Sequence, residues 1–212
     1  MRVNLAARAA AAEQRRGRTR ERLLDAAEAV VAEKGLEAAS VEEIVRGANV
    51  SRGTFYNYFP TSTDLIHALN LRVAAHLDDQ LDGLVAQSGD PATRLAATFH
   101  TVLVAYLEDP VRGWVAFQIA NSRAPRQRSF EARFAALYEQ GVAQGQFRQV
   151  DMNAAWTVAF GAMRMVQRDV VAGGAVPIQA VQVVALILTA FGLPYEDAER
   201  ISRDEAVAAR TP

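Results

Sequence analysis

Side chains of the kinds that contact nucleic acids alternate with apolar aromatics between Ser51 and Phe59. Helical spacing turns Phe55 and Phe59 toward a core and leaves the other positions outside. Hydroxyl, amide and guanidinium groups on such a helix can donate to phosphate oxygens or read base edges. The outward set is Arg52, Gly53, Thr54, Tyr56, Asn57 and Tyr58. The segment therefore predicts a helix that contacts DNA.

The residues before this segment predict a second helix and a tight turn that would position it. Ser40 and Glu43 form a capping box, in which the serine oxygen accepts a backbone N–H and the glutamate reaches back to the cap. A helix therefore begins near Val41. Asn49 ends it, because asparagine tolerates the left-handed conformation, and Ser51 caps the next helix. Two short helices joined in this way are typical of a helix-turn-helix.

The stretch SVEEIVRGANVSRGTFYNYFPTSTDL, from Ser40 to Leu65, resembles the N-terminal signature of the TetR family of bacterial transcriptional regulators. Upstream, AAEAVVAEKGLEAASVEEIV resembles the first two helices of that family's DNA-binding domain. Two positions depart from the family pattern: Asn49 replaces the usual glycine, and Ser62 replaces a lysine that helps to hold phosphate. We expect the DNA-binding domain at residues 18–60. Further expected DNA contacts are Arg18, Ser40, Ser51 and Ser62.

The same helix pair also occurs in helical bundles that never touch nucleic acid. The aromatic residues favour the DNA interpretation. Tyr56 and Tyr58 flank Asn57 on a short helix of otherwise small residues, so at least one phenol must be exposed, where it can donate to phosphate.

The start of the chain is basic. Seven arginines lie between Arg2 and Arg22, against Glu13 and Glu21. We predict a basic flexible arm over residues 1–17. Its arginines could neutralise phosphate or enter the minor groove, or the segment could be a solvated leader.

Composition indicates a regulator that stays in the cytoplasm. The 212 residues carry a net charge of −1 and include no cysteine, which excludes disulfide and thiol chemistry. Asn4 and Arg8 interrupt the apolar start, so no signal peptide is expected.

Few residues point to catalysis. The sequence has no glycine-rich phosphate loop, and His67, His76 and His100 lack metal-ligand spacing. We therefore expect no enzyme activity, metal or cofactor, although acid–base chemistry by scattered carboxylates stays an alternative.

The periodicity is helical throughout, which predicts an all-α fold. A long helix capped by Thr61 should link the DNA-binding domain to a ligand-binding and dimerisation domain over residues 61–212. The first expected helix runs from about Thr19 to Lys34, and the next three begin near Val41, Ser51 and Thr61. The fifth spans residues 91–108, the sixth ends near residue 123, and the seventh ends near Gln144. The eighth runs from Asp151 to Gly173, the ninth spans residues 177–191, and the last begins near Tyr195.

Large apolar residues recur at helical spacing in the second domain and could line a ligand pocket. Polar residues beside them could orient a ligand, with Arg164 suited to an anionic group. The candidate set is Phe99, His100, Leu103, Tyr106, Trp114, Phe117, Asn121, Phe134, Trp156, Phe160, Met163 and Arg164. Core packing, or ordinary surface exposure for the polar residues, is the alternative for each.

The apolar run from Val181 to Leu193 is too short to span a membrane and predicts a helix covered on more than one face. In the TetR family the last two long helices of each subunit form a four-helix dimer interface, and residues 151–173 and 177–191 resemble them. The candidate interface residues are Ala155, Ala159, Ala162, Val184, Ile187, Leu188 and Phe191. Packing within one subunit is the alternative.

The resemblance implies a homodimer that binds a palindromic operator, represses transcription and leaves DNA when a small, largely apolar or aromatic effector binds. The alternatives are a constitutive DNA-binding regulator without a ligand and an all-helical enzyme.

Overall fold

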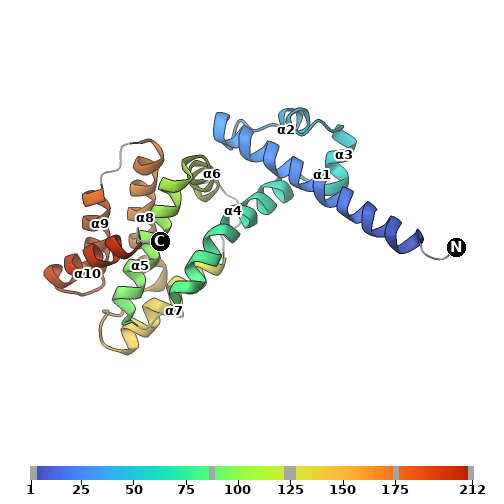
Figure 1. Cartoon of the computed structure of the whole chain (residues 1–212). Coiled ribbons are helices and arrows are strands. Elements are labelled where there is room, and N and C mark those ends of the chain that lie inside the picture. The colour runs from blue at the N-terminus through green and yellow to red at the C-terminus, as the bar shows by residue number, and fades with distance from the viewer. Residues whose placement is uncertain (1–3, 86–88, 122–127, 174–176, 210–212) are drawn as a thin grey trace. The chain divides into compact units, whose positions relative to one another are not determined.

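The computed structural model describes residues 4–85, 89–121, 128–173 and 177–209. These residues form ten helices and no strand, which confirms the all-α prediction (Figure 1). The helices are α1 Asn4–Lys34, α2 Val41–Gly47, α3 Arg52–Tyr58, α4 Ser62–Val85, α5 Pro91–Glu108, α6 Pro110–Asn121, α7 Arg128–Ala143, α8 Met152–Val171, α9 Pro177–Ala190 and α10 Tyr195–Ala208.

The chain divides into two compact units. One holds the described residues of Met1–Arg72 and Gln118–Pro125, and the other holds those of Val73–Phe117 and Arg126–Pro212. The first unit extends beyond the predicted boundary at residue 60, because the first turns of α4 belong to it and bury Leu65 and Leu69 completely.

Helix α1 forms the base of the first unit. It buries Leu23, Leu24 and Val31, and α2 packs against it and then against α3. The predicted start of this helix near Thr19 was wrong, since α1 begins at Asn4. The alanine-rich sequence before Thr19 explains the difference, because alanine has the highest helix propensity of all residues.

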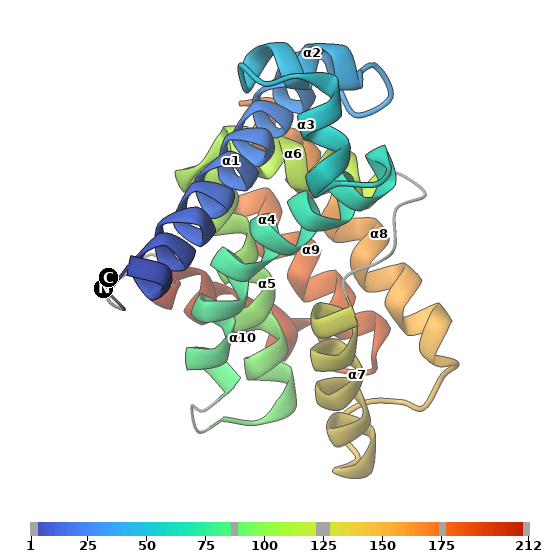
Figure 2. The ribbon, with the colours of Figure 1, turned by 90° about the vertical axis from the view of Figure 1, so that its right-hand side faces the viewer.

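Helix α5 organises the second unit, packing against α7, α8, α9 and α10 (Figure 2). Its start is well defined: the Asp90 carboxylate accepts from the N–H groups of Ala92 and Thr93, and Pro91 occupies the first turn. The predicted cap of α8 is also confirmed, because Asp151 accepts from Ala154 N–H at 3.1 Å.

The apolar helix α9 packs between neighbours, as its sequence indicated. It contacts α5, α8 and α10, and it buries Val184 and Leu188 completely. Among the described residues, every helix is too short or too polar to cross a bilayer.

Candidate nucleic-acid interface and ligand domain

The predicted capping box at the start of α2 is present. The Ser40 Oγ accepts from Glu43 N–H at 3.3 Å, and the Glu43 carboxylate accepts from Ser40 N–H at 3.4 Å. Lys34 at the end of α1 donates to the same carboxylate. The hydrogen bonds from Lys34 and Ser40 lower the pKa of Glu43, so the cap stays charged at neutral pH.

The turn between α2 and α3 is fastened to α1. Asn49 has φ +50°, the left-handed conformation expected for it. The Arg22 guanidinium donates to the carbonyl oxygens of Ala48 and Asn49, at 3.1 Å for Asn49. These bonds satisfy carbonyls left over at the end of α2. Sequence reasoning placed Arg22 only among the basic residues near the start of the chain and missed this role.

Helix α3 has the two faces that its sequence predicted. Phe55 and Phe59 are buried, with ring centroids 5.9 Å apart. Ser51 caps the helix by accepting from Thr54 N–H at 3.0 Å. The opposite face carries the exposed residues Arg52, Gly53, Tyr56 and Asn57, with Thr54 and Tyr58 partly buried at its sides.

Arg52 contacts Glu42 and Tyr56 at the surface of the first unit. Its Nη1 lies 2.5 Å from Glu42 Oε1, and its guanidinium carbon lies 5.9 Å from the Tyr56 ring centroid. The Arg52 and Glu42 side chains are 62% and 55% exposed, so their ion pair contributes little stability. A phosphate or a base edge could replace the carboxylate at small cost.

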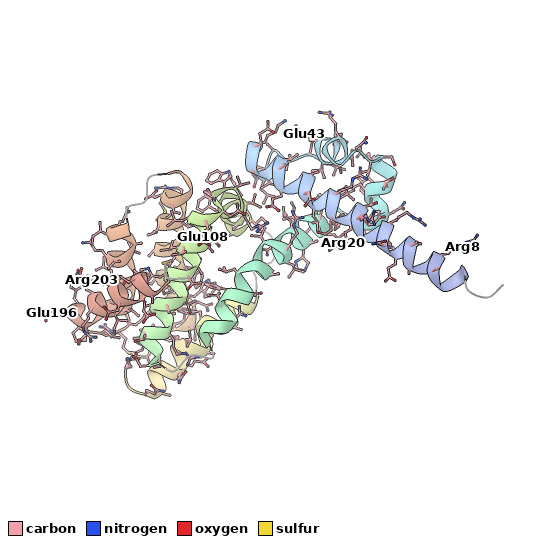
Figure 3. All side chains as sticks on the ribbon, in the orientation of Figure 1. Arg8, Arg20, Glu43, Glu108, Glu196 and Arg203 are labelled. Atoms are coloured by element: carbon pink, nitrogen blue, oxygen red, sulfur yellow. The ribbon has the colours of Figure 1, made fainter. Side chains whose placement is uncertain are left out.

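Arginines of α1 lie over the end of α3. The Arg16 guanidinium carbon is 5.8 Å from the Tyr58 ring centroid, and that of Arg20 is 5.5 Å from the Phe59 centroid. Figure 3 labels Arg20 on α1. Of the other predicted contacts, Arg18 and Ser62 are exposed, whereas Ser40 and Ser51 use their hydroxyl groups as helix caps.

The second unit gathers several of the predicted ligand residues in one aromatic cluster. Phe134 contacts Trp156 and Phe160 edge to face at 5.5 and 5.7 Å, and Trp156 and Phe160 stack on each other. Phe99 meets Phe160 at 6.2 Å. Sequence reasoning missed Tyr138 and Phe147, which extend the cluster. Tyr138 stacks on Phe134 within α7, and both Tyr138 and Phe147 contact Phe191, which lies far along the chain.

Burial separates the candidate ligand residues into two groups. The fully buried group belongs to the hydrophobic core and consists of Phe99, Leu103, Phe134 and Met163. The partly buried group is Tyr106, Trp114, Phe117, Trp156, Phe160 and Arg164. On α6, Trp114 and Phe117 stack with centroids 5.4 Å apart. The partly buried group is the one with surface left for a ligand.

Polar groups converge where α5, α6 and α8 meet. Gln167 is buried, and its Nε2 donates to the Gly113 carbonyl at 3.2 Å. Burial of the Tyr106 phenol raises its pKa to about 12, against the effect of a hydrogen bond from Gln167. Tyr106 is therefore a neutral hydroxyl group at physiological pH.

His100 serves the fold. It is buried, and its Nε2 lies 2.9 Å from the Oγ of Ser202, which donates to the Val181 carbonyl at 2.8 Å. This link joins α5 to α10 and α9, so His100 has a structural role, and its ligand role stays a prediction. The Asn121 side chain lies outside the described residues.

The predicted dimer residues lie mostly inside the chain. Ala155, Ala159, Val184, Ile187, Leu188 and Phe191 are all buried in the core of the second unit, and Ala162 is partly buried against it. Side chains covered by their own chain cannot contact a partner, so this assignment was wrong for the six buried residues. Periodicity identified the apolar faces but could not show which of them the core takes.

A metal-binding cluster of histidine and carboxylate residues is not found in the described parts of the chain.

Known proteins share both the short helix pair and the whole chain's architecture. A family model described as bacterial regulatory proteins, tetR family, matches residues 23–69. YvdT of Bacillus subtilis (strain 168), an uncharacterized HTH-type transcriptional regulator, is 43% identical over 63 residues, 30% of this chain and 32% of that protein. The chain thus aligns with about a third of that relative's length.

Longer matches are more distant. KstR2 of Rhodococcus jostii (strain RHA1), an HTH-type transcriptional repressor, is 24% identical over 188 residues, 83% of this chain and 92% of that protein. The crystal structure of RolR in complex with resorcinol superposes with a TM-score of 0.66 and 26% identity, covering 94% of this chain and 97% of that one.

The capped turn, the two-faced α3 and the helical second unit are the architecture of helix-turn-helix transcriptional regulators. Residues 23–69 thus carry the DNA-binding region of the tetR family, and the chain as a whole shares its fold with RolR.

Proposed function

We propose that this protein is a repressor that binds a palindromic DNA operator as a homodimer and releases it when a small aromatic molecule binds the second unit. The observation that carries this proposal is the exposed face of α3, which presents Arg52, Tyr56 and Asn57 on a helix fixed from behind by Phe55 and Phe59.

Each exposed side chain of α3 suits a particular contact. An asparagine can pair with the N6 and N7 atoms of adenine, and an arginine with the O6 and N7 atoms of guanine. A tyrosine hydroxyl can donate to phosphate, which fixes position without reading sequence. We assign base reading to Asn57 and Arg52, and backbone contact to Tyr56.

The dimer interface is best supported on the outer faces of α8 and α9, which pack against each other. Val158 and Met165 are exposed on α8, and Ile178 and Leu186 are exposed on α9. Gly161, between Val158 and Met165 on α8, is also exposed and leaves room for a helix of the partner to approach closely. Two copies joined by a twofold axis would bury these residues. Such a dimer must place its two α3 helices about one DNA turn apart, roughly 34 Å, which calls for a palindrome.

Aromatic and hydroxyl chemistry supports an aromatic effector. The partly buried rings of Trp114, Trp156 and Phe160 could stack on a planar ligand. Tyr106 and Gln167 could bind its polar substituents. The likeness to RolR, whose structure holds resorcinol, makes small phenols the first compounds to try.

Helix α4 could transmit the response, because its residues contribute to both units. In the first unit Arg72 pairs with Asp25 of α1 at 2.6 Å and also with Glu28. In the second unit Asp78 pairs with Arg133 of α7. Ion pairs thus join the first part of α4 to α1 and its second part to α7. A ligand that displaces the second part of α4 would also displace the first part, because both belong to one continuous helix.

Selection of duplexes from a random DNA pool tests the proposal directly. We expect the purified protein to enrich a palindrome, and resorcinol or a related phenol to release it while changing tryptophan fluorescence. Enrichment of no sequence would contradict the proposal. The alternative, a constitutive DNA binder, predicts an enriched palindrome whose affinity does not respond to any aromatic compound.

A further inference from the structure

One face of α1 carries arginines at seven-residue spacing: Arg8, Arg15 and Arg22. Seven residues fall about 20° short of two helical turns, so the three side chains form a nearly straight line. Arg18 lies close to the same line. The line begins at the helix-turn-helix, where Arg22 holds the carbonyls of Ala48 and Asn49, and runs toward the start of α1.

The start of α1 continues past the DNA-reading helix. Arg16 lies over Tyr58, the last residue of α3, so residues 4–15 reach beyond α3 (Figure 1). Twelve residues of helix span about 18 Å, the rise of roughly five base pairs. Arg8 lies on this projecting part (Figure 3). We call residues 4–18 of α1 the helical arm.

The helical arm carries a net positive charge, with four arginines against one glutamate. Arg8, Arg15 and Arg18 are exposed, and none of them pairs with a carboxylate of the described residues. Glu13 is the only acidic residue among positions 4–18. Alanines at positions 6, 7 and 9–12 are small enough for another surface to approach the helix closely.

We propose that the helical arm is a phosphate-binding rod that lies along the DNA flanking each operator half-site. Arg8 and Arg15 contact the sugar-phosphate backbone outside the sequence that α3 reads. DNA is the partner because the arm is the direct continuation of the helix that anchors the helix-turn-helix. The inference rests on the proposed function and adds a sequence-independent contact outside the recognition site.

The arm makes affinity depend on DNA length. The test uses the selected duplex in two forms, trimmed to the palindrome or extended by about ten base pairs, one DNA turn, at each end. Affinity is measured at several salt concentrations for the wild type, Arg8→Ala/Arg15→Ala and Arg8→Lys/Arg15→Lys. Alanine keeps helix propensity, so the arm stays folded, and circular dichroism checks this. The matched control is Arg200→Ala/Arg203→Ala, which removes two exposed arginines of α10.

We expect the wild type and the control to bind the extended duplex roughly tenfold more tightly than the trimmed one. The alanine variant should lose this preference, and its salt slope should fall by about 0.9 for each phosphate that the arm no longer neutralises. The lysine variant should restore most of the preference for the extended duplex and most of the salt slope. If the wild type binds both duplexes equally, or the alanine variant keeps the preference, the arm inference is wrong while the proposed function stands. If no duplex binds, both are wrong.

Discussion

At the scale of single residues, Tyr106 shows how the second unit changes the chemistry of a side chain. Burial raises the pKa of its phenol to about 12, and its hydrogen-bond partner Gln167 also donates to the Gly113 carbonyl. A neutral hydroxyl group beside an amide can both donate and accept hydrogen bonds. Such a pair suits a ligand with its own hydroxyl groups better than an anion.

The raised pKa predicts a loss of stability in alkaline solution. An unfolded tyrosine ionises near pH 10, whereas folded Tyr106 holds its proton up to about pH 12. The stabilisation is therefore fully present below pH 10 and is lost between pH 10 and 12, amounting to about 2 to 3 kcal/mol. Denaturant unfolding at pH 9 and 11.5 should show a smaller loss in Tyr106→Phe than in the wild type. Equal losses would show that Tyr106 titrates normally.

Residue roles were predictable where the causes are local. Ser40, Asn49 and Phe55 act through neighbours a few positions away, so spacing alone identified the cap, the turn and the buried face of α3. His100 could not be assigned in this way, because its partner Ser202 lies 102 positions along the chain. The hydrogen bonds from Arg22 to the carbonyls of the turn could not be predicted either, because these carbonyls also lie far from Arg22 along the chain.

At the scale of elements, the end of α7 shows how a turn and a core support each other. The N–H groups of Gln146 and Gly145 bond to the carbonyls of Gly141 and Val142, and Gly145 has φ +71°, which makes a Schellman motif. Phe147 then folds its ring onto Gly141, where an added Cβ atom would overlap the Cδ2, Cε2 and Cγ atoms of the ring.

Gly141→Ala should therefore destabilise the second unit by about 1 to 3 kcal/mol, because the Phe147 ring must leave its place in the core. Gly17→Ala is the matched control, since Gly17 is exposed in α1 with no atom near its would-be Cβ. That change should be neutral or stabilise by up to about 1 kcal/mol. Urea unfolding of both variants measures the difference, and similar free energies for the two would rule out the close packing.

The ends of the helices could be predicted from capping residues and helix breakers in the sequence. Which face of each helix is buried could not be predicted in this way. Asp90, Asp151 and Gly173 mark helix ends through their own side chains or backbone conformations. Helix α9 is apolar on nearly every side, so its composition could not separate the face that packs on α8 and α10 from the face left outside. The three-dimensional packing made that choice, placing Leu188 inside and Leu186 outside.

At the scale of the whole molecule, the outer face of α8 and α9 is the basis for the proposed assembly. Leu186 is 57% exposed and Met165 is 48% exposed, whereas the neighbouring Leu188 is completely buried. The same substitution at two leucines of one helix therefore separates assembly from folding.

Leu186→Arg should give a folded monomer, because it places a charge in the interface without touching the core. Leu188→Arg should unfold the second unit, because an unpaired charge cannot be buried without a large desolvation cost. Light scattering and thermal melting of both variants measure the two effects. A Leu186→Arg protein that stays dimeric would place the interface on another surface.

The central claim, that α3 reads a DNA sequence, is tested most directly by the ratio of affinities for the selected duplex and a scrambled duplex of equal length. We expect a wild-type ratio of about 10³ or more at physiological salt. Asn57→Ala should lower the ratio by a factor of about 5 to 150, equivalent to about 1 to 3 kcal/mol, while leaving the melting temperature unchanged, because Asn57 is exposed. A wild-type ratio near one, or an unchanged ratio in Asn57→Ala, would contradict this account.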